Sequence, residues 1–141
     1  MIRAATLADR AAILEILLEE TKKYPLRPDL DRMKKVIVDA ISSAQHFAWV
    51  VEKNRKVLGV ILGLTSDNLW AQRKNCNIVA WVSKSPGEGI SLLREFTKWV
   101  KFRRAIRVAG MTIDCEVDER VWSLAERLGF EKRNGTLVLF N

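Results

Sequence analysis

Hydrophobic positions change their period along this chain, and the changes mark out helices and strands. After a short extended segment at 2–5, apolar residues recur at helical spacing up to about position 41. From His46 the period becomes that of strands, with a turn expected at Lys53-Asn54-Arg55. In chain order, the expected elements are a strand at 2–5, helices at 6–23 and 28–41, strands at 47–52, 56–64 and 75–83, a helix at 90–104, a strand at 106–116, a helix at 118–128, and strands at 130–133 and 136–140.

The first two expected helices each have an apolar stripe that should face a core. Thr6 followed by Asp9 resembles a capping box at the start of the first helix, and Tyr24-Pro25 ends that helix. The expected buried stripes are Leu7, Ala11, Leu14, Leu17 and Leu18 in the first helix, and Leu30, Met33, Ile37, Ala40 and Ile41 in the second. Gly129 is expected to cap the last helix, and Asn134-Gly135 to turn the final hairpin.

The order of these elements predicts one α/β domain over residues 1–141. Two helical crossovers, 84–105 and 117–129, separate consecutive strands, and such crossovers join strands that run parallel. Short turns join the other strands, which should therefore be antiparallel. We expect a mixed, mainly antiparallel sheet flanked by helices, with a place where central strands splay apart.

The composition is that of a folded protein. With 48% hydrophobic and 29% charged residues, the chain can bury a core and is not disordered. Its apolar runs, such as 57–64, are too short to span a bilayer, and the opening segment lacks the apolar stretch of a signal peptide, so we expect a soluble, cytoplasmic protein. Cys76 and Cys115 have no Cys or His at metal-ligand spacing, which predicts buried thiols and no metal site.

The net charge is +7, from 24 Lys and Arg against 17 Asp and Glu. Such an excess attracts polyanions by long-range steering, but the cations are spread along the whole chain, which is typical of a solvated surface. The expected helix at 90–104 has a basic polar face formed by Arg94, Lys98 and Lys101. A nucleic-acid-associated protein is therefore kept as one hypothesis.

The segment from Val82 to Ile90 is the most informative about chemistry. A strand leads through Lys84-Ser85-Pro86-Gly87-Glu88-Gly89 into a helix. The first N–H groups of a helix have no partner within it, and the helix dipole favours negative charge there. Gly87 and Gly89 let the backbone approach a diphosphate without a Cβ, and Lys84 adds a positive charge. The pattern predicts a phosphate cradle, although two glycines at a helix start are equally typical of a simple turn.

Two short motifs and the order of elements resemble the GCN5-related N-acetyltransferase (GNAT) superfamily. Lys84-x-x-Gly87-x-Gly89 resembles its pyrophosphate loop, Arg/Gln-x-x-Gly-x-Gly/Ala, and the segment 124–130 resembles its Leu-Tyr-x-x-x-Gly-Phe motif. The likeness covers essentially the whole chain. It implies that acetyl-CoA binds between the strands 75–83 and 106–116 and that the acetyl group passes directly to an amine. The residues implied to hold the cofactor are Val82, Ser83, Lys84, Ser85, Gly87, Glu88, Gly89, Ile90 and Trp122.

The residues expected to handle protons depart from that family's pattern. Ala125 stands where a Tyr commonly protonates the leaving thiolate, and Asn77 stands where an acidic residue often acts as the base. An amide orients water but accepts no proton at neutral pH. Asn77 and Glu116 are the catalytic residues that we expect, with Asp114 and His46 as further candidates that would act through water. The titratable candidates are better explained as ordinary surface or loop residues.

We therefore expect an acetyl-CoA-dependent N-acetyltransferase that acts on a primary amine of a small molecule or a protein, mainly by positioning the reactants. The backbone N–H of Val82 would polarise the carbonyl. Two alternatives stay open: an inactive module of the same fold that binds acyl-CoA or a protein partner, and the nucleic-acid-associated protein. The segments 24–31 and 66–74 do not reveal the acceptor, but Trp70, in a polar loop, suggests a substrate groove or a subunit contact such as a homodimer.

Overall fold

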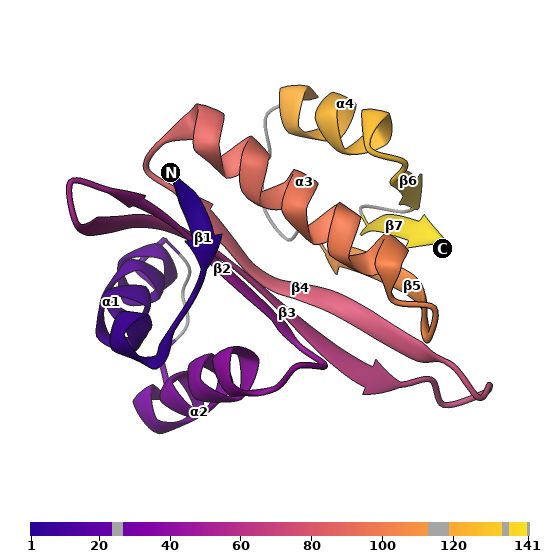
Figure 1. Cartoon of the computed structure of the whole chain (residues 1–141), viewed down its shortest axis with the longest axis horizontal. Coiled ribbons are helices and arrows are strands. Elements are labelled where there is room, and N and C mark those ends of the chain that lie inside the picture. Colours follow the sequence, from indigo (N-terminus) through magenta and orange to yellow (C-terminus); the bar gives the residue numbers. More distant parts are fainter. Residues whose placement is uncertain (24–26, 113–118, 134–135, 141) are drawn as a thin grey trace.

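The computed structural model describes residues 1–23, 27–112, 119–133 and 136–140, and within them four α-helices lie on the two faces of a seven-stranded sheet (Figure 1). The elements are β1 (Ile2–Ala4), the 3-10 helix η1 (Leu7–Asp9), α1 (Arg10–Thr21), α2 (Leu30–Ser42), β2 (Phe47–Lys53), β3 (Lys56–Asp67), β4 (Lys74–Ser83), α3 (Pro86–Phe102), β5 (Ile106–Thr112), α4 (Glu119–Arg127), β6 (Glu131–Arg133) and β7 (Thr136–Phe140). None of the helices in these ranges is both long enough and apolar enough to cross a membrane.

The strands lie in the order β1-β2-β3-β4-β5-β7-β6 across the sheet. β4 and β5 are parallel, and every other neighbouring pair is antiparallel. The parallel pair arises because α3 carries the chain from the end of β4 back to the start of β5. The mixed, mainly antiparallel sheet is confirmed. β6 runs in the direction of β5, as the second crossover requires, but β7 lies between them.

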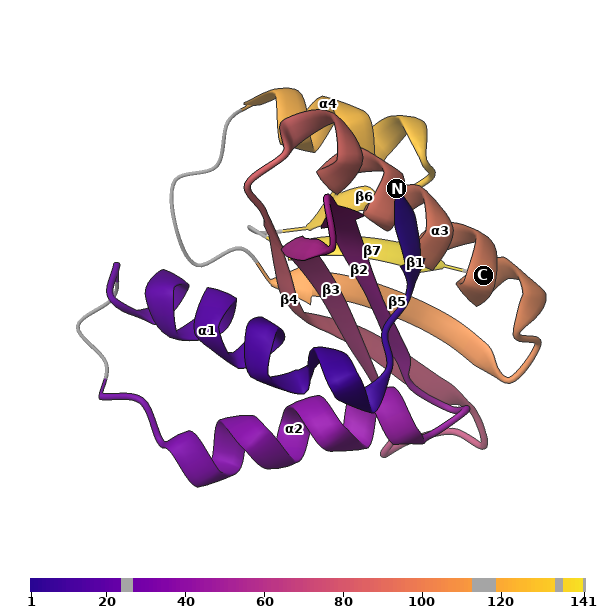
Figure 2. The ribbon, with the colours of Figure 1, turned by 60° about the vertical axis from the view of Figure 1, so that its left-hand side comes forward.

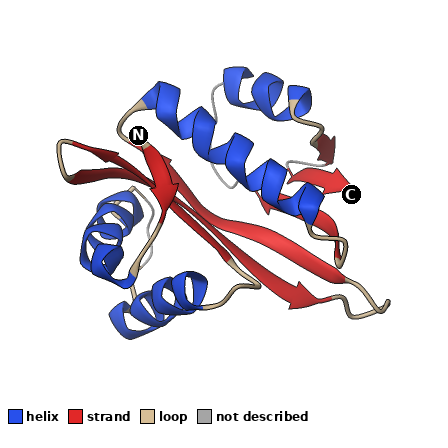
Figure 3. Cartoon of the chain, viewed as in Figure 1, coloured by secondary structure: helices blue, strands red, loops and turns tan. Residues whose placement is uncertain are grey.

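Each face of the sheet is covered by a pair of helices. α1 and α2 lie on one face, and α3 and α4 lie on the other (Figures 2 and 3). Ile13, Ile16 and Ile37 of the first pair are buried against Val50 and Val60 of the sheet. The buried side chains on the other face are Phe47, Val51, Ile61, Cys76, Ile78, Leu92, Leu93, Phe96, Val100, Ile106, Ala109, Ala125, Phe130 and Leu139. The sheet is thus held between two apolar cores.

The buried face of α1 differs from the expected stripe. Ile13 and Ile16 are the buried residues of this helix, and Leu14 and Leu17 of the expected stripe pack partly buried against the same core, whereas Leu7 and Ala11 are exposed. The segment 11–18 has apolar residues on several sides of the helix. Periodicity alone therefore could not select the side that meets the sheet.

The second helix follows its expected pattern more closely. Asp29 caps it, because its Oδ1 accepts from the N–H of Arg32 at 3.1 Å. Ile37 and Ala40 are buried as expected. Leu30, in the first turn, is instead exposed, because this end of the helix extends beyond the core.

α3 begins at Pro86 and not at Ile90, where the apolar pattern places its start. Proline suits the first turn of a helix because it lacks the N–H that would be unpaired there. Gly87 and Gly89 therefore belong to the helix and not to a loop before it. The expected glycine-bearing loop is reduced to a short connection between β4 and α3.

A buried carboxylate ties the first strand to the first helix. Asp9 is 7% exposed, and its oxygens accept from Nη1 and Nη2 of Arg3 at 2.7 and 2.9 Å. The same carboxylate accepts from the backbone N–H of Thr6 at 2.8 Å, which is the expected capping-box contact. Arg3 also donates to Glu52 of β2 at 3.1 Å. Hydrogen bonding to the Arg3 guanidinium lowers the pKa of Asp9.

Asp9→Asn is expected to lower the free energy of unfolding by ~2–3 kcal/mol at neutral pH, because an amide cannot replace a carboxylate that binds both arms of a guanidinium. A carboxylate whose pKa is lowered on folding stabilises the protein above its ordinary pKa, and this contribution is lost as the pH falls through the lowered value. Urea unfolding across this range should therefore show the gap between wild type and variant closing below about pH 4.

The matched control for this prediction is Asp39→Asn. It removes the exposed pair between Asp39 and Lys35, whose atoms lie 2.7 Å apart. Its cost should stay below about 0.5 kcal/mol. A gap between wild type and Asp9→Asn that does not change with pH would contradict the ion pair as the source of the stability.

Candidate functional site

β4 and β5 pair over only part of their length. The pairs run from Lys74 with Ile106 to Asn77 with Gly110. Beyond Asn77, β4 continues along β3 to Ser83, and no pair joins it to β5 among the described residues. The predicted splay between central strands is therefore confirmed. Its vertex lies at Asn77, and its open end lies toward the start of α3.

An extra residue in β4 lies just beyond the vertex. Leu62 of β3 pairs with Ala80, and the next residue, Gly63, pairs with Ile78, so Val79 has no partner in the register. Ile78 packs in the core beneath α3, whereas Ala80 packs on the α1–α2 side. In a regular strand these two side chains would share a face. The β-bulge at Val79 reverses the alternation and leaves its own side chain 49% exposed.

The last backbone groups of β4 point to two different sides. The N–H of Lys84 donates to the C=O of Leu58 on β3 at 2.8 Å. Because bonded and non-bonded pairs alternate in an antiparallel ladder, the backbone of Val82 also bonds to β3. The backbone groups of Trp81 and Ser83 then point to the side that β5 has left. The N–H of Val82, expected to polarise a carbonyl, faces away from the splay.

Most amides at the start of α3 have acceptors within the protein. The N–H of Ser85 donates to Ser83 Oγ at 3.0 Å, and those of Glu88 and Gly89 donate to the C=O of Ser85 at 3.1 and 3.0 Å. The expected row of unpaired amides is therefore shorter than the sequence pattern indicates. The N–H of Gly87 has no acceptor among the described residues. The N–H of Ser85 has only a neutral hydroxyl, which a charged acceptor can displace.

The two glycines of this turn have different surroundings. A Cβ on Gly87 would meet no atom within 4 Å. A Cβ on Gly89 would lie 2.9 Å from the Cβ of Ser83, which is closer than real Cβ contacts. The C=O of Gly89 also accepts from Trp81 Nε1 at 2.9 Å, which holds α3 against the end of β4. Gly89 is therefore a packing residue, and Gly87 is where a ligand can approach the backbone.

The charged side chains beside this turn are paired. Lys84 Nζ lies 2.9 Å from Glu19 Oε2 of α1, and this hydrogen bond raises the pKa of Lys84 and lowers the pKa of Glu19. Both side chains are exposed, so the pair can exchange partners easily. Glu88, which would repel an anion, bonds to the amino group of Met1 at 3.0 Å.

The structure describes three of the residues named for proton handling. Asn77 is exposed at the vertex of the splay. Ala125 is fully buried in α4. Its side chain is a methyl group, which has no proton to give to a leaving group. His46 Nδ1 accepts from the N–H of Thr65 at 3.0 Å, and β3 separates this histidine from the splay. The remaining candidates, Asp114, Cys115 and Glu116, lie outside the described residues.

Three further residues named in the sequence analysis are buried or partly buried. Cys76 is buried, and its burial raises the pKa of the thiol to about 11, so it is no nucleophile at neutral pH. Trp122 packs partly buried against the core, with Lys132 Nζ 4.5 Å from its ring centre. Ile90 is half-buried within the first turns of α3. In the described ranges no three His, Cys, Asp or Glu gather as metal ligands would.

The bulge is the feature of the site that sequence reasoning missed. Residues 78–82 are continuously apolar, a pattern typical of a strand buried on both faces, which hides the point where the alternation reverses. A glycine inside the neighbouring strand, Gly63, was the available signal, since such a glycine often marks a bulge. A Cβ there would lie 2.9 Å from the ring of Phe96.

Solved acetyltransferase structures share this fold. A ribosomal-protein-alanine N-acetyltransferase from Brucella melitensis has a TM-score of 0.74 at 18% identity, over 100% of this chain and 99% of that one. An N-acetyltransferase from Staphylococcus aureus Mu50 has 0.74 at 20% identity, over 99% and 97%. A GNAT family acetyltransferase from Brucella melitensis in complex with acetyl-CoA has 0.69 at 21% identity, over 99% and 86%. No protein-family model and no curated protein matches the sequence. The predicted GNAT fold is confirmed.

Proposed function

We propose that this chain is an acetyl-CoA-dependent N-acetyltransferase that acts on a primary amine of a small molecule or a protein. The observation that carries the proposal is the splay of β4 from β5 next to the start of α3, on a fold that it shares with acetyltransferases. The splay exposes strand backbone, and the helix start offers an anion site beside it.

The residues at the splay fit the cofactor. The N–H groups of Gly87 and Ser85 would hold a diphosphate, where the helix dipole favours an anion and the open space beside Gly87 admits it. Lys84 would add a positive charge on leaving Glu19. The outward C=O of Trp81 and the outward backbone groups of Ser83 would pair with the amide groups of the pantetheine chain, as a strand edge pairs with a neighbouring strand.

Acetyl-CoA would supply the acyl donor as a thioester. On this side of β4 the N–H of Trp81, and not that of Val82, is the donor available to a developing oxyanion. Asn77 can orient an amine or a water by hydrogen bonding, but its amide removes no proton. Because Ala125 is buried and has no hydroxyl, α4 supplies no proton there. Alignment of the two reactants would then provide most of the rate.

A module that binds acyl-CoA or a protein partner without turnover is the second candidate. The amide of Asn77 at the vertex and the buried methyl of Ala125 favour it, because neither can transfer a proton. The two candidates share the binding site and differ only in turnover.

Calorimetry with acetyl-CoA tests binding, and thiol release in the presence of a panel of primary amines tests turnover. We expect micromolar binding and release with at least one class among polyamines, aminoglycosides and peptides with free amino groups. In a mechanism that rests on alignment of the reactants, with no general base, kcat/KM should rise about tenfold per pH unit toward the pKa of the amine itself. Lack of binding at millimolar acetyl-CoA would overturn the proposal, and binding without release from any amine would favour the inactive module.

A further inference from the structure

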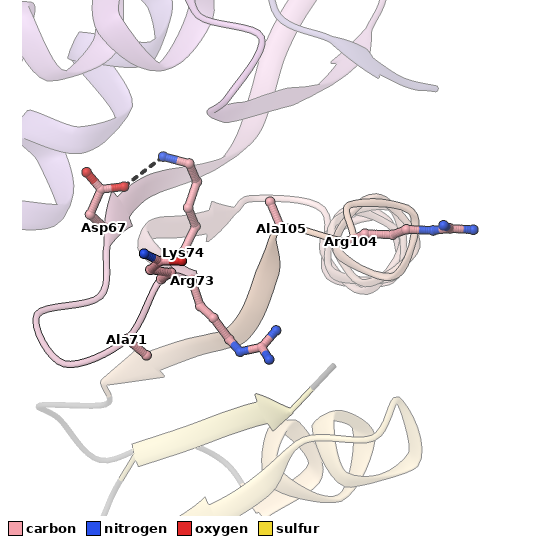
Figure 4. Close-up of a pocket in the computed structure, with 7 residues that line it drawn as sticks. Asp67, Ala71, Arg73, Lys74, Arg104 and Ala105 are labelled. Carbon is pink, nitrogen blue, oxygen red and sulfur yellow. Dashed lines mark hydrogen bonds and ion pairs between the residues drawn. The ribbon is translucent and has the colours of Figure 1, made fainter.

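A pocket of about 340 Å³ lies at the start of β4, whereas the splay opens toward the end of that strand (Figure 4). The pocket forms where the loop between β3 and β4 meets the turn between α3 and β5, and its lining residues are Asp67, Ala71, Gln72, Arg73, Lys74, Arg104 and Ala105. The N–H of Lys74 donates to the C=O of Ala105 at 3.0 Å, which joins the two segments. The volume is within the range of small-ligand sites.

The pocket has an excess of positive charge. Lys74 Nζ lies 2.8 Å from Asp67 Oδ1, and this hydrogen bond lowers the pKa of Asp67. The single acid of the lining is therefore ionised, and the charge of Lys74 balances its negative charge. Arg73 and Arg104 form no ion pair with any carboxylate in the described part of the chain. Figure 4 shows that they come from the two different segments that form the pocket. Their side chains extend in different directions, so the two guanidinium groups remain for two separate anionic groups of a ligand.

Each of the two segments also exposes an aromatic side chain. Trp70 precedes Arg73 in the loop and is 93% exposed, and Phe102 precedes Arg104 at the end of α3 and is 86% exposed. The loop is ordered, because Asn68 Oδ1 accepts from the N–H of Trp70 at 2.8 Å and from that of the next residue at 3.1 Å. A hydrogen-bonded loop that leaves a large apolar side chain in water gives up the stabilisation that burial of this side chain would provide. The two exposed aromatic side chains thus lie on the same two segments that supply Arg73 and Arg104 to the pocket.

We propose that this end of the molecule binds single-stranded nucleic acid, with one backbone phosphate on Arg73, a second on Arg104 and a base stacked on Trp70. Guanidinium groups bind phosphate oxygens through paired hydrogen bonds. An exposed indole next to a cationic pocket is the combination that single-strand binders use. Phe102 provides a second aromatic surface for a neighbouring base.

An acidic protein segment fits this surface less well. Its carboxylates would satisfy the two arginines, but its apolar side chains would find no apolar groove, because the pocket lining is charged or polar apart from two alanines. A duplex also fits less well, since its bases are stacked on one another and cannot stack on Trp70. On the basic face of α3, Lys98 pairs with Glu95 at 3.3 Å, and none of Arg94, Lys98 and Lys101 lines this pocket.

Fluorescence anisotropy with a short labelled oligothymidylate tests the proposal. Arg73→Glu with Arg104→Glu should weaken binding at least about tenfold and reduce the slope of log Kd against log salt by about 1.4, the value for two lost phosphate contacts on a single strand. Trp70→Ala should weaken binding by about 5- to 150-fold. The matched control is Arg32→Glu with Lys34→Glu, which makes the same change of net charge at exposed positions of α2 and should alter Kd less than about threefold.

Equal losses in the two double variants would overturn the proposal, because binding would then follow net charge alone. Unchanged affinity in Trp70→Ala, tighter binding of an oligoglutamate peptide, or a preference for duplex DNA would each overturn it as well. Thermal unfolding of every variant checks that the fold is retained. The measurement needs no acetyl-CoA, so its outcome is independent of the proposed acetyltransferase activity.

Discussion

Deleting Val79 is expected to leave the protein folded and to abolish most of its affinity for acetyl-CoA. Ile78 and Trp81 face the α3 side of the sheet, and Ala80 faces the α1–α2 side. Without Val79 these side chains follow the strict alternation of a regular strand, and the register with β3 on both sides of the bulge stays as it is. The free energy of unfolding should therefore change by less than ~1 kcal/mol, because only an inserted residue is removed.

The straightened strand should follow β5 beyond Asn77, which closes the splay. We expect the affinity for acetyl-CoA to fall at least about tenfold, or ~1.4 kcal/mol, in calorimetry, with urea unfolding as the measure of stability. Val79→Ala keeps the backbone bulge and removes a side chain that is 49% exposed, so it should bind as the wild type does. If the deletion variant unfolds, or if it binds normally, the bulge does not have the role assigned to it.

Local features of the fold followed from the sequence because they depend on a few neighbouring residues. The polar turn after β2 has left-handed backbone at Asn54 and Arg55, with φ of 52° and 61°, which a two-residue hairpin requires. Gly129 has φ of 101°, and the N–H of Phe130 reaches back to the C=O of Ala125 at 3.0 Å, as a helix cap requires. Asn54 and Gly129 are of the residue types that left-handed backbone favours, whereas Arg55 is not.

The candidate site was less predictable because its geometry depends on contacts between distant segments. The N–H of Lys84 is taken by Leu58, on a strand far away in the sequence. The bulge at Val79 depends on the register with β3, which no apolar pattern records. Trp70 was expected at a substrate groove or a subunit contact. It lies in the loop before β4, at the opposite end of that strand from the opening of the splay, and the subunit contact stays a prediction.

Gly87→Ala and Gly89→Ala are expected to separate ligand binding from stability. Gly89→Ala brings a Cβ to 2.9 Å from the Cβ of Ser83, where a helix and a strand are already in contact, and should lower the free energy of unfolding by ~1–3 kcal/mol. Gly87→Ala meets open space and restricts the unfolded chain, so it should raise that free energy by ~0.4–1 kcal/mol. The same methyl group stands where the diphosphate is proposed to approach, and affinity for acetyl-CoA should fall at least about tenfold in calorimetry.

Each half of this prediction has its own control. In the Gly89→Ala background, Ser83→Gly removes the atom that clashes and should recover about 1 kcal/mol in a double-mutant cycle, whereas Ser83→Ala keeps that atom and should recover nothing. Acetyl-pantetheine lacks the diphosphate, so its KM should be the same for Gly87→Ala and the wild type. Normal binding of acetyl-CoA by Gly87→Ala would mean that the diphosphate does not bind at the start of α3. Equal losses for both donors would mean that the methyl group disturbs the strand edge of β4, because only that edge is common to the two ligands.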